Sequence, residues 1–205
     1  RSIHSIFIGG GTPSLMTIDE IRKLFQGLQD RLSISRDVEV TIEANPGTFE
    51  VEKFAQFREI GINRLSIGVQ SFDNKHLKLL DRVHTRDESI EAIERAKSVG
   101  FHNLNVDLMY GLSGQTREQS LEDIKTAISF KPSHISLYQL TLEPNTIFAK
   151  YPPKLPKDEI IWEMGSVGAD LLEASGFNRY EISAYGKNFS QHNLNYWEFG
   201  DYIGI

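Results

Sequence analysis

Short apolar runs alternate with amphipathic stretches along the chain, and this alternation limits the possible folds more than any other feature of the sequence. The apolar runs are rich in β-branched residues, which is typical of strands, whereas the stretches between them carry apolar residues at helical spacing. Strands are expected at 3–8, 38–42, 64–69, 104–109, 134–140 and 180–184. Helices are expected at 17–32, 51–60, 74–80, 88–99, 117–130 and 158–174. Strict alternation predicts a parallel sheet, either open and doubly wound or closed into a full or partial barrel.

The composition narrows the class of protein. Of 205 residues, 40% are hydrophobic, which is enough for one domain with a sizeable core. The net charge is -6 and no block of Lys and Arg occurs, which argues against nucleic acid as a partner. No apolar run approaches the roughly 20 residues that cross a bilayer, so no membrane contact is indicated. The chain has no cysteine, which excludes disulfides and thiolate metal sites within it and is compatible with the cytoplasmic location that we expect.

A glycine run follows the first expected strand, at the kind of strand end where ligands bind in parallel α/β folds. The run is Gly9, Gly10 and Gly11, followed by Thr12 and Pro13. Glycines let a ligand approach the backbone closely. The run lacks the Gly-Lys-Ser/Thr ending of a P-loop and the spacing of the dinucleotide fingerprint. On its own it is explained at least as well by a tight strand-to-helix turn.

Two acids, Glu43 and Asp107, end apolar strands. A buried carboxylate without a partner costs several kcal/mol, so each needs a cation, strong donors or a wet cavity. A salt bridge to a framework arginine such as Arg64 would satisfy one of them. With Gln70 at the end of the strand between them, a shared ligand that carries hydroxyls and an ammonium is the better explanation.

Two further residues offer charge or metal chemistry. Arg82 follows the helix after Gln70 and could clamp a carboxylate through two hydrogen bonds, although a solvated surface arginine would have the same position in the sequence. His192 opens the segment His-Asn-Leu-Asn-Tyr-Trp at 192–197. This segment is either a loop whose rings pack on the fold or a site for a flat aromatic ligand such as haem, with His192 on the iron. The remaining histidines have no zinc-binding spacing, and no catalytic residue can be assigned.

Taken in order, these motifs resemble the radical S-adenosylmethionine (SAM) proteins of the HemW and oxygen-independent coproporphyrinogen III oxidase (dehydrogenase) family. The resemblance covers essentially the whole chain, and the ordered set is far more specific than the glycine run alone. The matching motifs are Gly9 to Pro13, Glu43, Gly68 to Gln70, Asp81-Arg82, Asp107 to Leu112 and His192 to Trp197.

The resemblance implies a partial (β/α)6 barrel of the TIM-like type, open on one side. Residues 1–151 would form the barrel core, and residues 152–205 the end of the barrel and the start of a C-terminal region. The first strand of this chain is similar to the second strand of the family. We therefore expect the chain to be cut at Arg1 and Ile205 from a longer protein, although a short protein processed at its N-terminus is the alternative.

The resemblance also implies roles for individual residues. The backbone of Gly9, Gly10, Gly11 and Thr12, together with Glu43, would face the ammonium group of SAM. Arg82 would clamp its carboxylate. The ribose hydroxyls would bind to Gln70 and Asp107.

The family further implies a [4Fe-4S] cluster on a C-x-x-x-C-x-x-C loop, where SAM is cleaved to a 5′-deoxyadenosyl radical. This chain has no cysteine, so the cluster belongs only to a longer protein and the fragment alone is expected to be inactive. No metal site is expected within the fragment.

Two functions follow from the resemblance. One is a haem chaperone that binds haem through His192 and delivers it to acceptor proteins. The other is a coproporphyrinogen III dehydrogenase, which decarboxylates propionate side chains during porphyrin synthesis. The segment at 193–197 and the sequence Glu-Ala-Asn-Pro at 43–46 are more similar to the chaperones. Neither the acceptor nor the electron donor can be named, and a barrel that binds another nucleotide remains a third interpretation.

Overall fold

The computed structural model describes residues 2–204, apart from the side chains of residues 48 and 49. Arg1 and Ile205, the predicted cut ends, lie outside the described residues. Seven strands form one sheet in the order β1-β2-β3-β4-β5-β7-β6. The parallel part contains β1 (Ile3–Ile8), β2 (Ile34–Ala44), β3 (Arg64–Gln70), β4 (Asn103–Tyr110) and β5 (His134–Gln139). Antiparallel pairing adds β7 (Ala184–Gly186) and β6 (Asn178–Arg179).

The helices lie between these strands. They are α1 (Ile18–Gln29), α2 (Thr48–Val51), α3 (Phe54–Glu59), α4 (Asn74–Leu79), α5 (Arg86–Ser98), α6 (Arg117–Ser129), α7 (Ile147–Lys150), α8 (Asp158–Ala174) and α9 (Gln191–Trp197), with a short 3-10 turn at Pro13–Leu15. Capping boxes start α1, α5 and α6, where Thr17, Thr85 and Thr116 each exchange hydrogen bonds with a Glu or Gln three residues later.

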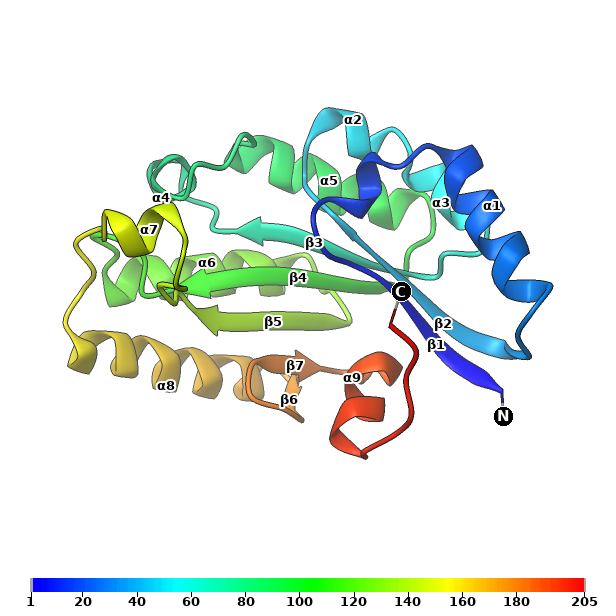
Figure 1. Ribbon diagram of the computed structural model, residues 1–205. Coiled ribbons are helices and arrows are strands. Elements are labelled where there is room, and N and C mark those ends of the chain that lie inside the picture. The colour runs from blue at the N-terminus through cyan, green and yellow to red at the C-terminus, as the bar shows by residue number, and fades with distance from the viewer. Residues whose placement is uncertain (1, 205) are drawn as a thin grey trace.

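The sheet curls into a half-barrel with helices on its outer side (Figure 1). Alternate strand residues such as Ile42, Leu65 and Val106 are buried between the sheet and these helices and form the hydrophobic core. The residues between them face inward and are polar, among them Asp107, which accepts a hydrogen bond from Ser66 on the neighbouring strand. The predicted partial TIM-like barrel is confirmed, and its inner face is lined with hydrogen-bonding groups.

The expected strand at 180–184 is wrong, and so is the expectation of a wholly parallel sheet. Residues 181–183 form a bend in which the guanidinium of Arg179 donates to the carbonyls of Glu181 and Ile182 at 3.1 and 2.6 Å. These local bonds take the place of ladder bonds. The strand β7 follows, and because it forms a hairpin with β6 it runs antiparallel to β5.

Two other elements differ from expectation. The helix expected at 51–60 is divided into α2 and α3 by a turn at Lys53. The ammonium of Lys53 donates to the carbonyls of Ser14, Leu15 and Met16 at 2.9–3.2 Å, which ties this turn to the segment after β1. The segment at 192–197, for which a loop was one of two interpretations, belongs to the helix α9.

A search of the described residues for a helix both long and apolar enough to cross a membrane found none.

Candidate functional site: a polar pocket at the barrel rim

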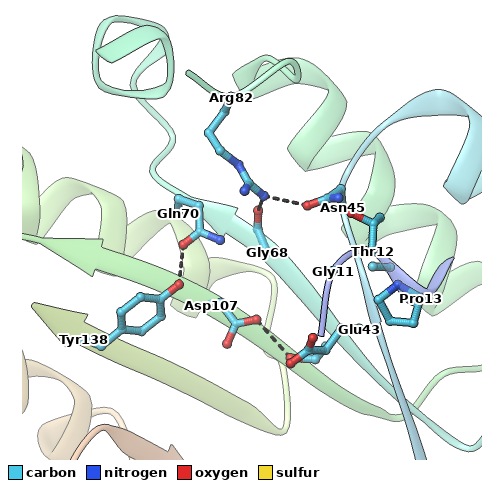
Figure 2. A pocket seen from close by; sticks show the side chains of 12 residues that line it. Gly11, Thr12, Pro13, Glu43, Asn45, Gly68, Gln70, Arg82, Asp107 and Tyr138 are labelled. Carbon is cyan, nitrogen blue, oxygen red and sulfur yellow. Dashed lines mark hydrogen bonds between the residues drawn. The ribbon is translucent and has the colours of Figure 1, made fainter. Parts of the chain in front are cut away.

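A cavity of about 380 Å³ opens at the C-terminal ends of the parallel strands (Figure 2). Its volume lies in the range of pockets that bind small organic ligands. The lining residues are Gly11, Thr12, Pro13, Glu43, Ala44, Asn45, Ser66, Gly68, Gln70, Arg82, Asp107 and Tyr138. The structure therefore brings six of the eight predicted SAM residues together in one place, and the other two, Gly9 and Gly10, contact Glu43 beside it.

The glycine turn after β1 is held against Glu43. The amide of Gly10 donates to Oε2 of Glu43 at 3.1 Å. Gly10 and Gly11 have φ angles of 79° and 40°, a region that favours glycine. A Cβ on Gly9 would lie 2.5 Å from the ring of Phe7 and 3.2 Å from the carboxyl carbon of Glu43. Glycines are thus required here for two reasons, backbone conformation and close packing.

Asp107 lines the same cavity as Glu43 (Figure 2). Its two oxygens accept hydrogen bonds from Ser66 Oγ at 2.9 Å and Asn105 Nδ2 at 2.8 Å. Burial raises the pKa of Asp107, and the bonds from Asn105 and Ser66 oppose this effect. Burial also raises the pKa of Glu43, where the Gly10 amide acts in the opposite direction and the charge of Asp107 adds to the rise. Two such carboxyl groups favour a ligand that brings a cation and hydroxyl donors.

A salt bridge from Arg64 was the structural alternative for these acids. Arg64 is buried, and its guanidinium donates to Thr41 Oγ1 at 3.5 Å. Among the residues that the structure describes, no ion pair within 4 Å joins it to Glu43 or Asp107. The charge of Arg64 lowers the pKa of Asp107 only as the weakest of several effects. Hence the acids are not explained by a framework ion pair.

Arg82 reaches into the cavity instead of lying on a solvated surface (Figure 2). Its guanidinium donates to Asn45 Oδ1 at 2.6 Å and to the carbonyl of Gly68 at 3.2 Å, and burial lowers its pKa. A Cβ on Gly68 would lie 3.3 Å from this guanidinium and 2.9 Å from the amide nitrogen of Gln70. Glycine at this position therefore allows both side chains to lie over the strand.

Gln70 ends β3 in an unusual conformation. Its φ angle is 68°, which is uncommon for a residue other than glycine. The hydroxyl of Tyr138 donates to its side-chain oxygen at 2.5 Å. Because the oxygen is engaged by Tyr138, the amide nitrogen is oriented as a donor over Gly68 (Figure 2).

Six lining residues were not among the predicted site residues, and three of them have polar side chains, namely Asn45, Ser66 and Tyr138. Asn45 and Tyr138 stand at strand ends, so strand-end position was a usable signal for both. Ser66 lies in the middle of β3 and reaches the pocket because the inner face of the half-barrel is open to it. No local pattern in the sequence marks such a residue.

His192 lies outside this pocket, on α9. Its ring stacks on Phe7 with centroids 4.5 Å apart and meets the ring of Tyr196 edge-on at 5.1 Å. It is half-buried, and burial lowers its pKa, which favours the neutral imidazole that can bind a metal. Phe7 precedes the glycine turn and its ring lies beside Gly9, so His192 packs near the strand end that borders the rim pocket.

Glu39 on β2 anchors the start of α9. This buried carboxylate accepts hydrogen bonds through Oε1 from Ser190 Oγ at 3.1 Å and from the amides of Gln191 and His192 at 2.9 and 3.3 Å. Asn103 donates to its other oxygen at 3.3 Å. A negative charge at a helix start is stabilising, so Glu39 fixes the position of α9 on the barrel.

Tyr180 forms a second anchor and connects α9 to the pocket. Its hydroxyl accepts from the amide of Ser190 and from Asn193 Nδ2, each at 3.2 Å, and it bonds His134 Nε2 at 2.7 Å. His134 Nδ1 bonds Asn105 Oδ1 at 2.6 Å, and Asn105 also holds Asp107. The amide oxygen of Asn105 can only accept, so His134 carries its proton on Nδ1 and accepts from Tyr180.

The pocket suits SAM in its chemistry. It presents two carboxyl groups, a guanidinium and an oriented amide, which match an ammonium, a carboxylate and two ribose hydroxyls, and the missing Cβ at Gly68 leaves room for close approach. An iron–sulfur cluster does not fit the residues present, since the chain has no cysteine. Within the described residues, no group of three or more His, Asp and Glu side chains is placed to hold a metal ion.

A half-barrel with a polar pocket of this kind at its rim is the architecture of radical SAM proteins. The family model for the Radical SAM superfamily matches residues 1–127, and the chain belongs to this superfamily. It is 48% identical to the heme chaperone HemW of Escherichia coli strain K12, over all of this chain and 55% of that protein. It is 39% identical to HemW of Bacillus subtilis strain 168, over 99% of this chain and 55% of that protein.

Among solved structures, the fold is similar to coproporphyrinogen III oxidase (HemN) from Escherichia coli, described as a radical SAM enzyme. The TM-score is 0.83 at 25% sequence identity, over 97% of this chain and 46% of that one. The chain thus spans about half the length of the curated relatives that it matches.

Proposed function

We propose that this chain is the SAM-binding barrel of a haem chaperone. The observation that carries the proposal is the convergence of Glu43, Gln70, Arg82 and Asp107 on one pocket, in a chain that is similar over its whole length to proteins named heme chaperone HemW.

The residues of the pocket divide the binding of SAM between them. Glu43 and the turn of Gly9, Gly10, Gly11 and Thr12 receive the ammonium, because the carboxylate of Glu43 is already oriented by the Gly10 amide. Arg82 receives the carboxylate of SAM from its position above Gly68.

Gln70 and Asp107 receive the ribose hydroxyls. Gln70 donates through the amide nitrogen that Tyr138 orients, and Asp107 accepts through its own carboxyl group, which Ser66 and Asn105 hold in place. Bound SAM supplies the organic group for radical chemistry in this superfamily. The residues of this chain hold and orient it, and no step that needs a cluster is assigned to them.

Haem is the proposed cargo, with His192 as its iron ligand. Burial lowers the pKa of the imidazole, which favours its neutral form, and the ring is fixed between two other rings. Beside it on α9, Tyr196 and Trp197 are about half exposed, at 48% and 51% of their surfaces, and offer flat apolar area to a porphyrin.

Titration of the full-length protein with haem tests this assignment. His192→Ala is expected to weaken haem binding by at least ten-fold and to change the Soret band, because a metal–imidazole bond is lost. His4→Ala is the matched control, since His4 is exposed on β1 and outside α9. An unchanged titration and spectrum in His192→Ala would remove His192 as the ligand.

Coproporphyrinogen oxidation is the second candidate, supported by the structural similarity to HemN. The full-length protein with reconstituted cluster, SAM and a chemical reductant for the cluster would be incubated with coproporphyrinogen III, and release of carbon dioxide would be measured. Decarboxylation at a rate above that of an Arg82→Ala control would favour the enzyme over the chaperone.

Other expectations from the sequence stay predictions. They are the division into a barrel core at 1–151 and a following region at 152–205, a cytoplasmic location, and the presence of a [4Fe-4S] cluster in the longer protein.

A further inference from the structure

The turn that follows β3 joins two residues of the rim pocket. Gln70 ends the strand with its positive φ angle, and Arg82 lies beyond the short helix α4. The register between β3 and β4 shifts between Ile67 and Gln70, so the regular ladder is interrupted just before Gln70, which pairs with Leu108. A non-glycine residue keeps a left-handed conformation only where the surrounding structure fixes it. The turn therefore needs an anchor from elsewhere.

Asp123 on α6 provides that anchor from outside the pocket. One of its oxygens accepts from the hydroxyl of Ser71 at 2.7 Å, and the other accepts from the amide of Phe72 at 2.7 Å. Both bonds are short and charge-assisted, and all three residues are buried. The two residues that Asp123 holds come directly after Gln70, so the carboxylate fixes the backbone where the left-handed turn leaves the strand.

The same contact extends to the start of α4. Ser71 Oγ accepts from the amide of Asp73, and Asp73 caps the helix by accepting from the amide of Lys75. The helix then leads to Arg82, whose amide donates to the carbonyl of Leu77 at 3.0 Å. The segment from Gln70 to Arg82 carries the side-chain amide and the guanidinium of the pocket. Displacing Asp123 would therefore disturb the positions of both side chains.

We infer that Asp123 is a positioning residue for SAM binding, which acts through Ser71 and Phe72 to hold Gln70 and Arg82 in place. This inference rests on the proposed SAM pocket and adds to it a residue from the outer helical layer that touches no ligand. A buried carboxylate that served only the stability of the fold would leave ligand affinity unchanged when it was removed.

The surroundings of Asp123 disfavour a charged carboxylate, so a role in stability alone does not explain this residue. Burial raises its pKa to about 6, and the negative charges of Asp73 and Glu122 add to the rise, whereas the bonds from Ser71 and Phe72 oppose it. Asp73 itself accepts from Gln119 on α6 at 3.5 Å and lies 3.7 Å from the buried imidazole of His76. An acid in this environment is unfavourable, and its two bonds to the turn account for its presence.

Calorimetric titration of the full-length protein with SAM, together with thermal unfolding, tests the inference. Asp123→Ala is expected to weaken SAM binding about ten-fold, because both anchoring bonds are lost and Gln70 is released. Asp123→Asn keeps an acceptor for the Phe72 amide and is expected to recover most of this loss. Ser133→Ala is the matched control, since this buried hydroxyl accepts from the amide of Leu104 at the opposite end of the sheet. It is expected to lower the Tm and leave the SAM affinity unchanged.

An affinity of Asp123→Ala within two-fold of the wild type would overturn the inference. If that variant does not fold, Ser71→Ala removes one of the two bonds and is expected to weaken SAM binding about three-fold, and an unchanged affinity there would overturn the inference equally. Gln70→Ala separates this result from a failure of the proposed function. If Gln70→Ala binds SAM normally, the pocket assignment is wrong; if Gln70→Ala is impaired and Asp123→Ala is not, only the positioning role is wrong.

Discussion

The rim pocket and α9 are built in opposite ways. The polar groups of the pocket are held by other protein groups. Gly10 holds Glu43, and Ser66 and Asn105 hold Asp107. Tyr138 holds Gln70 (Figure 2). On α9, the fixed atoms are at the start of the helix, whereas its aromatic side chains at 196 and 197 are about half exposed.

This difference fits two kinds of ligand. A small, highly charged molecule is bound best by groups that are already oriented, because little ordering is needed when it arrives. A large flat cargo that must also be released is served by a helix with a fixed start and an accessible aromatic face. We therefore expect changes in the pocket to affect SAM binding alone, and changes at the anchors of α9 to affect haem binding alone.

Acid sensitivity at His134 is the largest expected effect, since this residue joins the two regions. Burial lowers its pKa to about 3, from an ordinary value of 6.5. Folding thus favours the neutral imidazole of His134. The stability that this preference gives is fully present above pH 6.5, and it is lost as the pH falls from 6.5 toward 3. Between pH 6.5 and pH 5 the loss is about 2 kcal/mol in the free energy of unfolding.

Denaturant unfolding of the wild type and of His134→Gln at pH 6.5 and pH 5 measures this loss. The loss is the extra decrease in the free energy of unfolding that the wild type shows over the variant. The comparison with the variant is needed because Asp123, whose pKa is raised to about 6, acts in the opposite direction. Its folded state gains a proton before the unfolded state does, so its contribution increases as the pH falls below 6. Equal pH dependence in the two proteins would mean that His134 is not held neutral.

Asp107→Asn tests the pocket by itself. The amide that replaces the carboxylate would face two donors, Ser66 Oγ and Asn105 Nδ2, and would lose a charged acceptor for the ribose. SAM affinity is expected to fall by about 10- to 100-fold in calorimetric titration. Haem affinity is expected to stay within two-fold, and a parallel loss of both would contradict the separation of the two regions.

Glu39→Ala tests the anchor of α9 in the same way. Removal of the carboxylate leaves the Ser190 hydroxyl and two backbone amides without their acceptor and takes away a negative charge near Arg64. Haem affinity is expected to fall about ten-fold in Glu39→Ala and by a smaller factor in Glu39→Gln. SAM affinity is expected to stay unchanged in both variants. Spectroscopic titration with haem measures the first and calorimetry the second.

Tyr180→Phe is expected to have the smallest effect. The substitution removes one hydroxyl that accepts from Ser190 and Asn193 and donates to His134, while the stacking of its ring on Phe189 is kept. Haem affinity should fall two- to five-fold, as expected for the loss of neutral hydrogen bonds. A larger loss than that of Glu39→Ala would make Tyr180 the main anchor.

Most of the fold could be predicted from the sequence because its signals are local. The ranges of β1, β3 and α8 follow from apolar periodicity and from residues that start or stop an element. The prediction was wrong at 180–184, where the side chain of Arg179 bonds the backbone and an apolar run becomes a bend. Periodicity cannot detect a side chain that competes for backbone carbonyls.

The candidate site was predicted in part. Position at a strand end was enough to select Glu43, Gln70 and Asp107, which line one cavity. Nothing in the sequence marks Ser66 or Asp123, because one acts from mid-strand and the other from a helix on the outer side of the sheet.

The sequence by itself determined the alternation of strands and helices, the capped helix starts and the polar residues at the strand ends, since each depends on neighbours a few positions apart. Only the tertiary structure decided which of those residues meet. The curl of the sheet turns one face of every strand inward, and contacts such as Glu39 with residue 191 or Gln70 with residue 138 join positions far apart in the chain. Such contacts depend on strand register and sheet closure, which no local pattern encodes.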